Sequence, residues 1–82
     1  MEPKKIKELR LSLHMKRPEF GRFVAYVAKT DPVSHQAVYW WETGRNKPRG
    51  VYLRALEAIP RLVKEDPDIL LVEIGQGQTG TK

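Results

Sequence analysis

Hydrophobic residues recur at helical spacing in two segments near the start of the chain. Pro3 is tolerated in a first helical turn, and apolar residues then follow three and four positions apart, which predicts a helix ending near His14. A second helix is expected from about Pro18 to as far as Lys29, because its apolar residues repeat this spacing. The apolar positions of the two helices are Ile6, Leu9, Leu13, Phe20, Phe23, Val24 and Val27.

A third, shorter helix is expected after a break at residues 30–32. The residue before a proline is disfavoured in the α region, so Asp31-Pro32 separates this helix from the second one. Ser34 is a favourable N-cap, and Gly44 is a typical stop at the C-terminal end. Residues 35–43 therefore form the helix, and its apolar face consists of Ala37, Val38 and Trp41.

The second half of the chain contains one further amphipathic helix and a segment whose structure the pattern leaves open. The apolar spacing after residue 50 predicts a fourth helix that ends around Pro60. Asp66-Pro67-Asp68 is typical of a helix cap, yet the apolar residues 69–74 are few enough to form either a helix or a strand. We expect an all-α bundle of four to five helices over residues 1–74 and a disordered, glycine-rich tail over residues 75–82.

Composition limits what such a chain can be. Eighty-two residues have room for one small core, which excludes a two-domain enzyme. The absence of cysteine excludes disulfides and Cys-ligated metal sites. No apolar run reaches the roughly 20 residues that span a bilayer, so we expect a cytoplasmic protein without membrane association. The expected core residues are Ile6, Leu9, Leu13, Phe20, Phe23, Val24, Val38, Trp41, Leu53 and Leu56.

The positive charge is concentrated in the first half of the chain. The formal net charge is +5 for the whole sequence. Residues 1–50 carry eleven basic and five acidic residues, a balance of +6, whereas residues 51–82 carry four basic and five acidic residues, a balance of −1. A basic surface on the first three helices favours a polyanionic partner.

The order and spacing of several motifs resemble the Xre/Cro family of phage-type regulators. Residues 6–59 carry the resemblance, and it is most specific at Trp41-Glu42, Gly44 and Pro48, which match the family pattern W-E-x-G-x-x-x-P. The resemblance implies a lambda-repressor-like fold with a helix-turn-helix, in which the third helix enters the major groove of DNA. It also implies a bacterial, phage or prophage protein that associates with the nucleoid.

The resemblance implies a set of DNA-contacting residues. Family members contact bases and nearby phosphates from the start of the third helix, and we expect Tyr39 and Trp40 to face the same way further along it. Gln36 has the donor and acceptor needed to bind adenine. The implied base contacts are Ser34, His35, Gln36, Tyr39 and Trp40, and the implied phosphate contacts are Lys16, Arg17, Arg45, Asn46, Lys47 and Arg49. Arg10 and Glu42 occupy positions of an internal ion pair in similar proteins.

The chain departs from the family pattern between the second and third helices. Residues 25–31 are extra, and we expect them to lengthen the second helix and its return to the third, which puts the usual angle between the two helices in doubt. Lys16 replaces the usual Ser or Thr N-cap, and His14 replaces the usual turn glycine. The second helix therefore begins with weak local signals.

The function that follows is a transcriptional regulator, most simply a repressor, that binds a palindromic operator as a homodimer. The apolar residues 69–74 are candidates for the contact between the two copies. An antitoxin-type module that binds both DNA and a protein partner is the alternative, and a non-specific nucleic-acid binder is a third hypothesis. No catalytic motif, cofactor site or metal site is expected, because the two histidines lie on different elements and no phosphate-binding glycine loop occurs.

Overall fold

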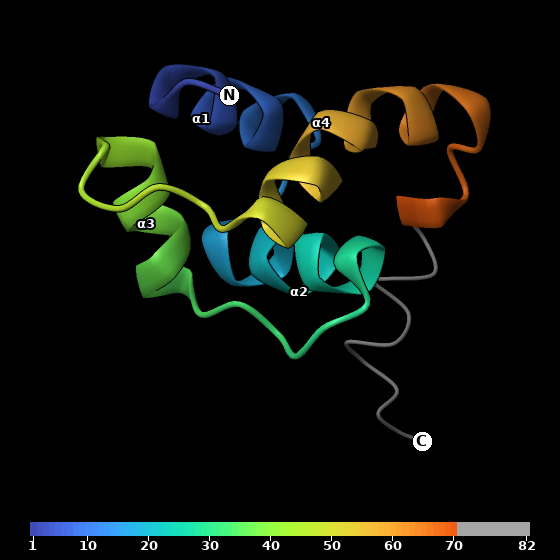
Figure 1. The fold of residues 1–82 in the computed structure, drawn as a ribbon. Helices are drawn as coiled ribbons and strands as arrows, with labels where there is room; N and C mark the ends of the chain where they lie inside the picture. Colours follow the sequence, from blue (N-terminus) through green and yellow to red (C-terminus); the bar gives the residue numbers. More distant parts are fainter. Residues whose placement is uncertain (71–82) are drawn as a thin grey trace.

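The fold is a small bundle of helices packed around a single core. The computed structural model describes residues 1–70, in which four helices and no strand occur. The helices are α1 (Pro3–Ser12), α2 (Arg17–Ala28), α3 (His35–Thr43) and α4 (Gly50–Glu65). Figure 1 shows α3 at one end of the molecule, beside α1, while α2 and α4 extend towards the other end. The expected all-α bundle is thereby confirmed.

The turn before α2 and both ends of α2 form without the residues that usually favour them. Glu19 compensates for the missing N-cap hydroxyl of α2, because its Oε1 accepts a hydrogen bond from the Lys16 N–H at 2.8 Å. His14 turns the chain between α1 and α2 at φ 59°, and Lys29 ends α2 at φ 61°. Both are left-handed conformations that favour glycine, at a cost of about 1–2 kcal/mol for other residues.

Residues 25–28 extend α2, as expected. The helix runs to Ala28, and the chain then returns to α3 along residues 29–34. Two contacts hold this return segment against the bundle. Thr30 Oγ1 lies 3.3 Å from the Tyr52 hydroxyl of α4. The Val33 backbone lies so close to Gly21 that a Cβ built on this glycine would be 2.1 Å from the Val33 carbonyl oxygen.

Helix α4 does not end at Pro60, and the prediction that it does is wrong. The helix continues to Glu65. A proline removes one backbone hydrogen bond, but the apolar face continues beyond it through Leu62 and Val63, which are both half-buried. Burial of that face outweighs the local penalty.

The cap expected near residues 66–68 is present. The Asp68 N–H donates to Asp66 Oδ1 at 3.2 Å, and the Ile69 N–H donates to the Asp66 carbonyl oxygen at 3.1 Å. Ile69 and Leu70 are helical and half-buried. The remainder of the apolar segment, residues 71–74, and the expected tail, residues 75–82, lie outside the described residues.

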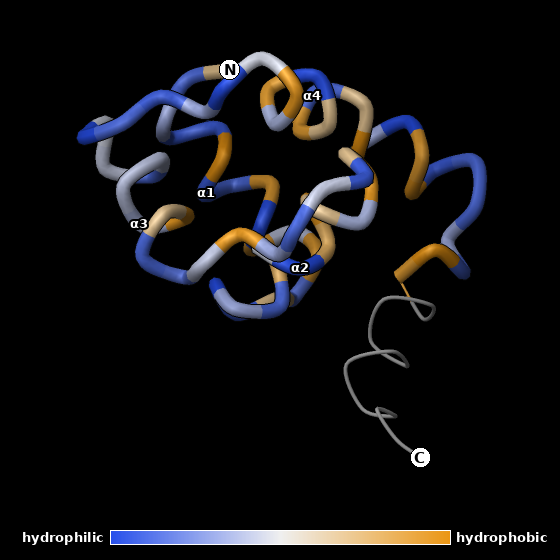
Figure 2. Tube along the Cα trace, turned by 60° about the horizontal axis from the view of Figure 1, so that its bottom comes forward, coloured by the Kyte–Doolittle hydropathy of each residue, from blue (hydrophilic) through white to orange (hydrophobic). Residues whose placement is uncertain are grey.

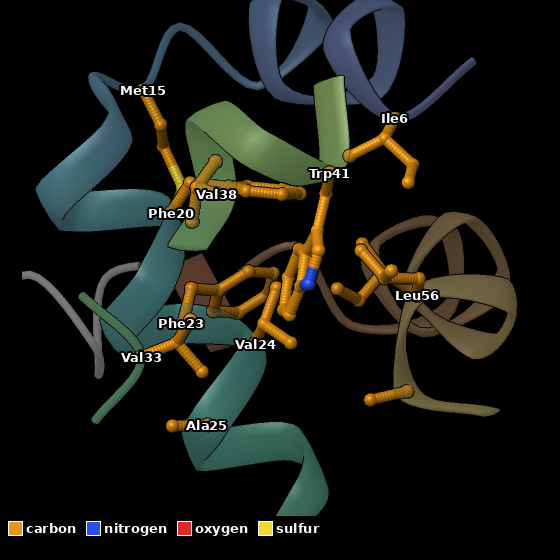
Figure 3. Close-up of a cluster of buried hydrophobic side chains, with 12 residues drawn as sticks. Ile6, Met15, Phe20, Phe23, Val24, Ala25, Val33, Val38, Trp41 and Leu56 are labelled. Carbon is orange, nitrogen blue, oxygen red and sulfur yellow. The ribbon is translucent and has the colours of Figure 1, made fainter. Parts of the chain in front are cut away.

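The core lies where α2, α3 and α4 meet, and Trp41 occupies its centre. Figure 3 shows the Trp41 ring pointing between Phe23 and Val24 on one side and Leu56 on the other. Seven of the ten expected core residues are buried, and Leu9, Leu13 and Leu53 are half-buried at its edge because they lie near helix ends or the loop before α4. The core also contains five residues that the prediction omitted: Met15, Ala25, Val33, Ala55 and Ile59.

Candidate nucleic-acid interface

Helix α3 presents a polar face to solvent at one end of the bundle. Ser34 caps the helix, since its Oγ accepts a hydrogen bond from the Ala37 N–H at 3.1 Å, and Gly44 ends it at φ 81°. Val38 and Trp41 are buried on the inner side of α3. The 3.6-residue period then leaves its other side open, and the exposed positions there are His35, Gln36, Tyr39 and Thr43. In Figure 2 this end of the molecule is mostly hydrophilic.

Tyr39 and Trp40 do not face the same way, contrary to the prediction. Tyr39 is 46% exposed and lies beside Arg17 of α2. Trp40 is half-buried, and the Arg45 guanidinium lies 5.4 Å from the centre of its ring. Consecutive residues in an α-helix are rotated by about 100° from each other, so Tyr39 lies on the open face and Trp40 lies at its edge.

The loop after α3 places positive charge next to that face. Its first two amides fold back on the helix, because the Arg45 and Asn46 N–H groups both donate to the Trp40 carbonyl oxygen, at 2.9 and 3.3 Å. The side chains that follow are exposed at Arg45, Asn46, Lys47 and Arg49.

An open hollow brings this loop to the start of α3. Five predicted DNA-contacting residues line it, namely Ser34, Trp40, Asn46, Lys47 and Arg49, together with Val33, Ala37, Trp41 and Tyr52. Ser34 lies at the N-terminal end of α3, where the helix dipole is positive, and the loop supplies cations. This combination suits a phosphate group.

The expected ion pair between Arg10 and Glu42 is present and buried. Arg10 Nε donates to Glu42 Oε2 at 2.6 Å, and Arg10 Nη2 donates to Oε1 at 3.3 Å. The third nitrogen, Nη1, donates to the Met15 carbonyl oxygen at 3.1 Å. The two side chains are 9% and 1% exposed. This network joins α1 to the end of α3 and to the turn before α2, so it has a structural role.

Arg17 is engaged within the protein, which the prediction of a phosphate contact did not anticipate. Its Nε donates to Glu42 Oε1 at 3.1 Å, and its guanidinium carbon lies 5.1 Å from the centre of the Tyr39 ring. The side chain is 34% exposed. Lys16, its neighbour in sequence, is exposed.

The residues missed from the sequence are those whose roles depend on contacts between helices. Gly21 is required because the Val33 backbone leaves no room for a side chain there. Tyr52 contacts both Thr30 and Trp41, and the centres of the Tyr52 and Trp41 rings are 5.6 Å apart. For Arg17 a signal did exist in the sequence. A cation in the first turn of a helix is disfavoured by the helix dipole and needs a partner elsewhere.

Neither a metal site nor a spanning segment occurs among residues 1–70. No three His, Asp or Glu side chains gather there in a way that could hold a metal ion. None of the helices in that range has both the length and the apolar character to cross a membrane. Comparison with known protein families, curated proteins and solved structures found no match to this chain. The residues themselves therefore carry the functional interpretation.

Proposed function

We propose that this protein is a sequence-specific regulator that binds double-stranded DNA with α3 in the major groove. The observation that supports it is the open face of α3, where His35, Gln36 and Tyr39 are exposed beside the cations of the following loop. A helix of this kind fits the major groove, and flanking cations and helix N-termini hold the phosphates that set its register. The resemblance to Xre/Cro regulators supports the same interpretation.

The base contacts follow from the side chains on that face. Gln36 lies in the first turn of α3 and carries the amide that pairs with adenine N6 and N7. His35 is exposed at the start of α3, and its imidazole N–H can donate to a guanine acceptor or a phosphate. Trp40 contacts the phosphate backbone rather than a base in this proposal, since it lines the hollow with Lys47 and Arg49.

Selection of duplexes from a random pool tests this function. We expect one enriched motif, bound at least a hundredfold more tightly than a scrambled duplex, since specific sites exceed non-specific ones by about 10³ or more. Gln36→Ala should lose about tenfold discrimination at one position. The control is Arg61→Ala, an exposed position on α4, which should leave the discrimination unchanged. Equal affinity for all duplexes would favour non-specific binding, and the absence of binding would refute the proposal.

We further propose that the regulator acts as a homodimer and represses transcription by covering a promoter. One recognition helix reads only a few base pairs, so a pair of copies on a palindrome supplies specificity. A hollow at the end of the bundle away from α3 is lined by half-buried or exposed apolar groups that include Tyr26, Val27, Leu62 and Ile69. A second copy bound at this end leaves α3 free for DNA (Figure 1).

Sedimentation velocity tests the dimer. Tyr26→Asp should lower the sedimenting mass to that of a monomer, because Tyr26 is 42% exposed and a charge there opposes burial against a second copy. Ser12→Asp on α1 is the control and should leave the mass unchanged. A mass that Tyr26→Asp does not alter would remove this surface from the proposal. Retention of a different protein by the same surface would favour the antitoxin-type alternative.

A further inference from the structure

Arg17 stands at an unfavourable position for a positive charge. It is the first residue of α2, where the helix dipole favours acidic side chains. Its partner is Glu42, but this carboxylate already receives two hydrogen bonds from Arg10. Two guanidinium groups on one buried carboxylate leave a net positive charge on the cluster. Neutralisation of Glu42 therefore does not explain why Arg17 is there.

The geometry links Arg17 to the exposed face of α3. Tyr39 and Glu42 lie three residues apart on α3 and are thus neighbours on the helix surface. Arg17 bridges them from α2, with Nε bonded to Glu42 Oε1 and the guanidinium over the Tyr39 ring. The Glu42 end of this bridge is fixed, because its side chain is only 1% exposed and is held by Arg10.

We propose that Arg17 is a positioning residue that holds the Tyr39 ring in one orientation on the reading face of α3. By fixing this ring it sets the base preference where Tyr39 meets DNA, and it does not neutralise a phosphate. This inference rests on the proposed DNA-binding function for its effect on base preference. The part that concerns the orientation of Tyr39 stands on the geometry of the free protein.

Nuclear magnetic resonance of the free protein tests the positioning. In the wild type, the Tyr39 Hα–Hβ couplings should be unequal, as in a single side-chain rotamer. Arg17→Met keeps the length of the side chain but removes the guanidinium, so the couplings should average and the ring shifts should move towards those of a free tyrosine. Arg54→Met, an exposed position on α4, is the matched control and should leave Tyr39 unchanged. Averaged couplings in the wild type, or an unaffected Tyr39 in Arg17→Met, would overturn the inference.

Measurements of DNA binding then show whether Arg17 positions Tyr39 or contacts a phosphate. Arg17→Met should relax base preference at one position by about twofold to fivefold, the size expected for loss of a cation–π contact. The slope of log affinity against log salt should stay the same, whereas loss of a phosphate contact reduces its steepness by about 0.9. Tyr39→Ala should relax the same position, and the double variant should add nothing further.

The possible outcomes distinguish the two proposals. A reduced salt slope with unchanged base preference would assign Arg17 to a phosphate and contradict the inference. Arg17→Lys keeps the charge but lacks the planar group that both bonds Glu42 and stacks on a ring, so it should not restore Tyr39. If the wild type binds no specific duplex, the proposed function fails, and the Tyr39 couplings still decide whether Arg17 positions the ring.

Discussion

At the scale of single residues, one buried carboxylate connects the structure of this protein to its proposed reading face. Glu42 binds Arg10 on one side and Arg17 on the other, with nearly no exposure to solvent. A buried charge is tolerated only when it is paired and hydrogen-bonded, and this one accepts hydrogen bonds from three nitrogen atoms. The end of α3 is therefore held to α1 and α2 at the same point.

Breaking the buried pair should destabilise the fold. Arg10→Ala should lower the free energy of unfolding by about 3 kcal/mol, because it leaves the Glu42 carboxylate buried with only Arg17 as a partner. Arg17→Met is the comparison and should cost less than about 1 kcal/mol, since Arg17 is partly exposed. Urea denaturation measures both. Loss of DNA affinity with unchanged stability in Arg10→Ala would instead identify Arg10 as a direct DNA contact.

The close approach of Val33 to Gly21 predicts that a side chain at residue 21 lowers the stability of the fold. Gly21→Ala should destabilise the protein by about 1–3 kcal/mol, because the new methyl group meets a backbone carbonyl oxygen that has little room to move. Gly50→Ala is the control, where a Cβ comes no closer than 3.6 Å to Arg54 Nη1. It should raise stability by about 0.5 kcal/mol, since alanine favours a helix. Equal effects of the two changes would contradict the crowding at Gly21.

At the scale of the elements, α2 and α3 both end at a residue in the left-handed conformation, but they begin with different caps. Helix α3 begins with a side-chain cap and ends at a glycine, as its sequence indicates. Helix α2 begins with Glu19 bonded to the Lys16 amide and ends at a lysine in the left-handed region. Helix α4 contains Pro60 in its interior and still completes its last turn. The two ends of α3 could be predicted from the sequence, because Ser34 and Gly44 are standard cap residues. The ends of α2 and α4 depend on the residues that the next segment of the chain buries.

The effect of Ser34 on the stability of α3 can be separated from its effect on DNA binding by two substitutions. Ser34→Ala should cost about 1 kcal/mol, because one backbone N–H of the first turn loses its acceptor. Ser34→Asp keeps an acceptor and should retain stability, but it should weaken binding to duplex DNA because a negative charge then faces the phosphates. Thermal unfolding and fluorescence anisotropy measure the two effects. Undiminished binding by Ser34→Asp would place the DNA away from the start of α3.

The proline inside α4 should be a net cost to the fold. Pro60→Ala should raise the free energy of unfolding by about 1–2 kcal/mol, since the interior penalty of about 3 kcal/mol is partly offset by the greater freedom of the unfolded chain. Pro67→Ala lies in the turn after the helix and should bring no gain. Chemical denaturation compares them. A loss of stability in Pro60→Ala would show that the proline directs Leu62 and Val63 onto the core.

At the scale of the whole molecule, the basic loop after α3 and the apolar hollow beside Tyr26 lie at different ends. The exposed cations Arg45, Lys47 and Arg49 lie in the loop beside the open face of α3. The apolar hollow with Tyr26 and Ile69 lies at the far ends of α2 and α4 (Figure 1). This separation allows DNA and a second copy to bind at the same time.

The number of phosphate contacts gives a prediction for the whole surface. Five of the phosphate contacts that the sequence predicts are cations, and five neutralised phosphates correspond to a salt slope of about −4.5. With Arg17 engaged by Glu42, four remain, so we expect a slope of about −3.6, and Lys47→Gln should reduce its steepness by about 0.9. Arg61→Gln on the exposed side of α4 is the control and should leave the slope unchanged. Affinity measured at several salt concentrations checks this, and a slope near zero would exclude a backbone contact.

Much of the local structure follows from the sequence, because local signals act over a few residues. The spacing of Ile6, Phe20 and Val38 predicts which helix faces are buried, and Ser34 and Gly44 predict both ends of α3. The exposed positions of α3 follow from the same period. Met15 and Val33 were missed in the core because both lie outside helices, where hydrophobic spacing carries no information.

Contacts between elements were decided only by the tertiary structure. The sequence by itself determined the helical bundle of the described residues 1–70, the bounds of the third helix at residues 35–43 and a basic first half. It did not determine that α4 continues past Pro60 or that Arg17 turns inward to Glu42. Each of these depends on burial or charge pairing between residues distant in sequence, and such energies exist only once the helices have packed together.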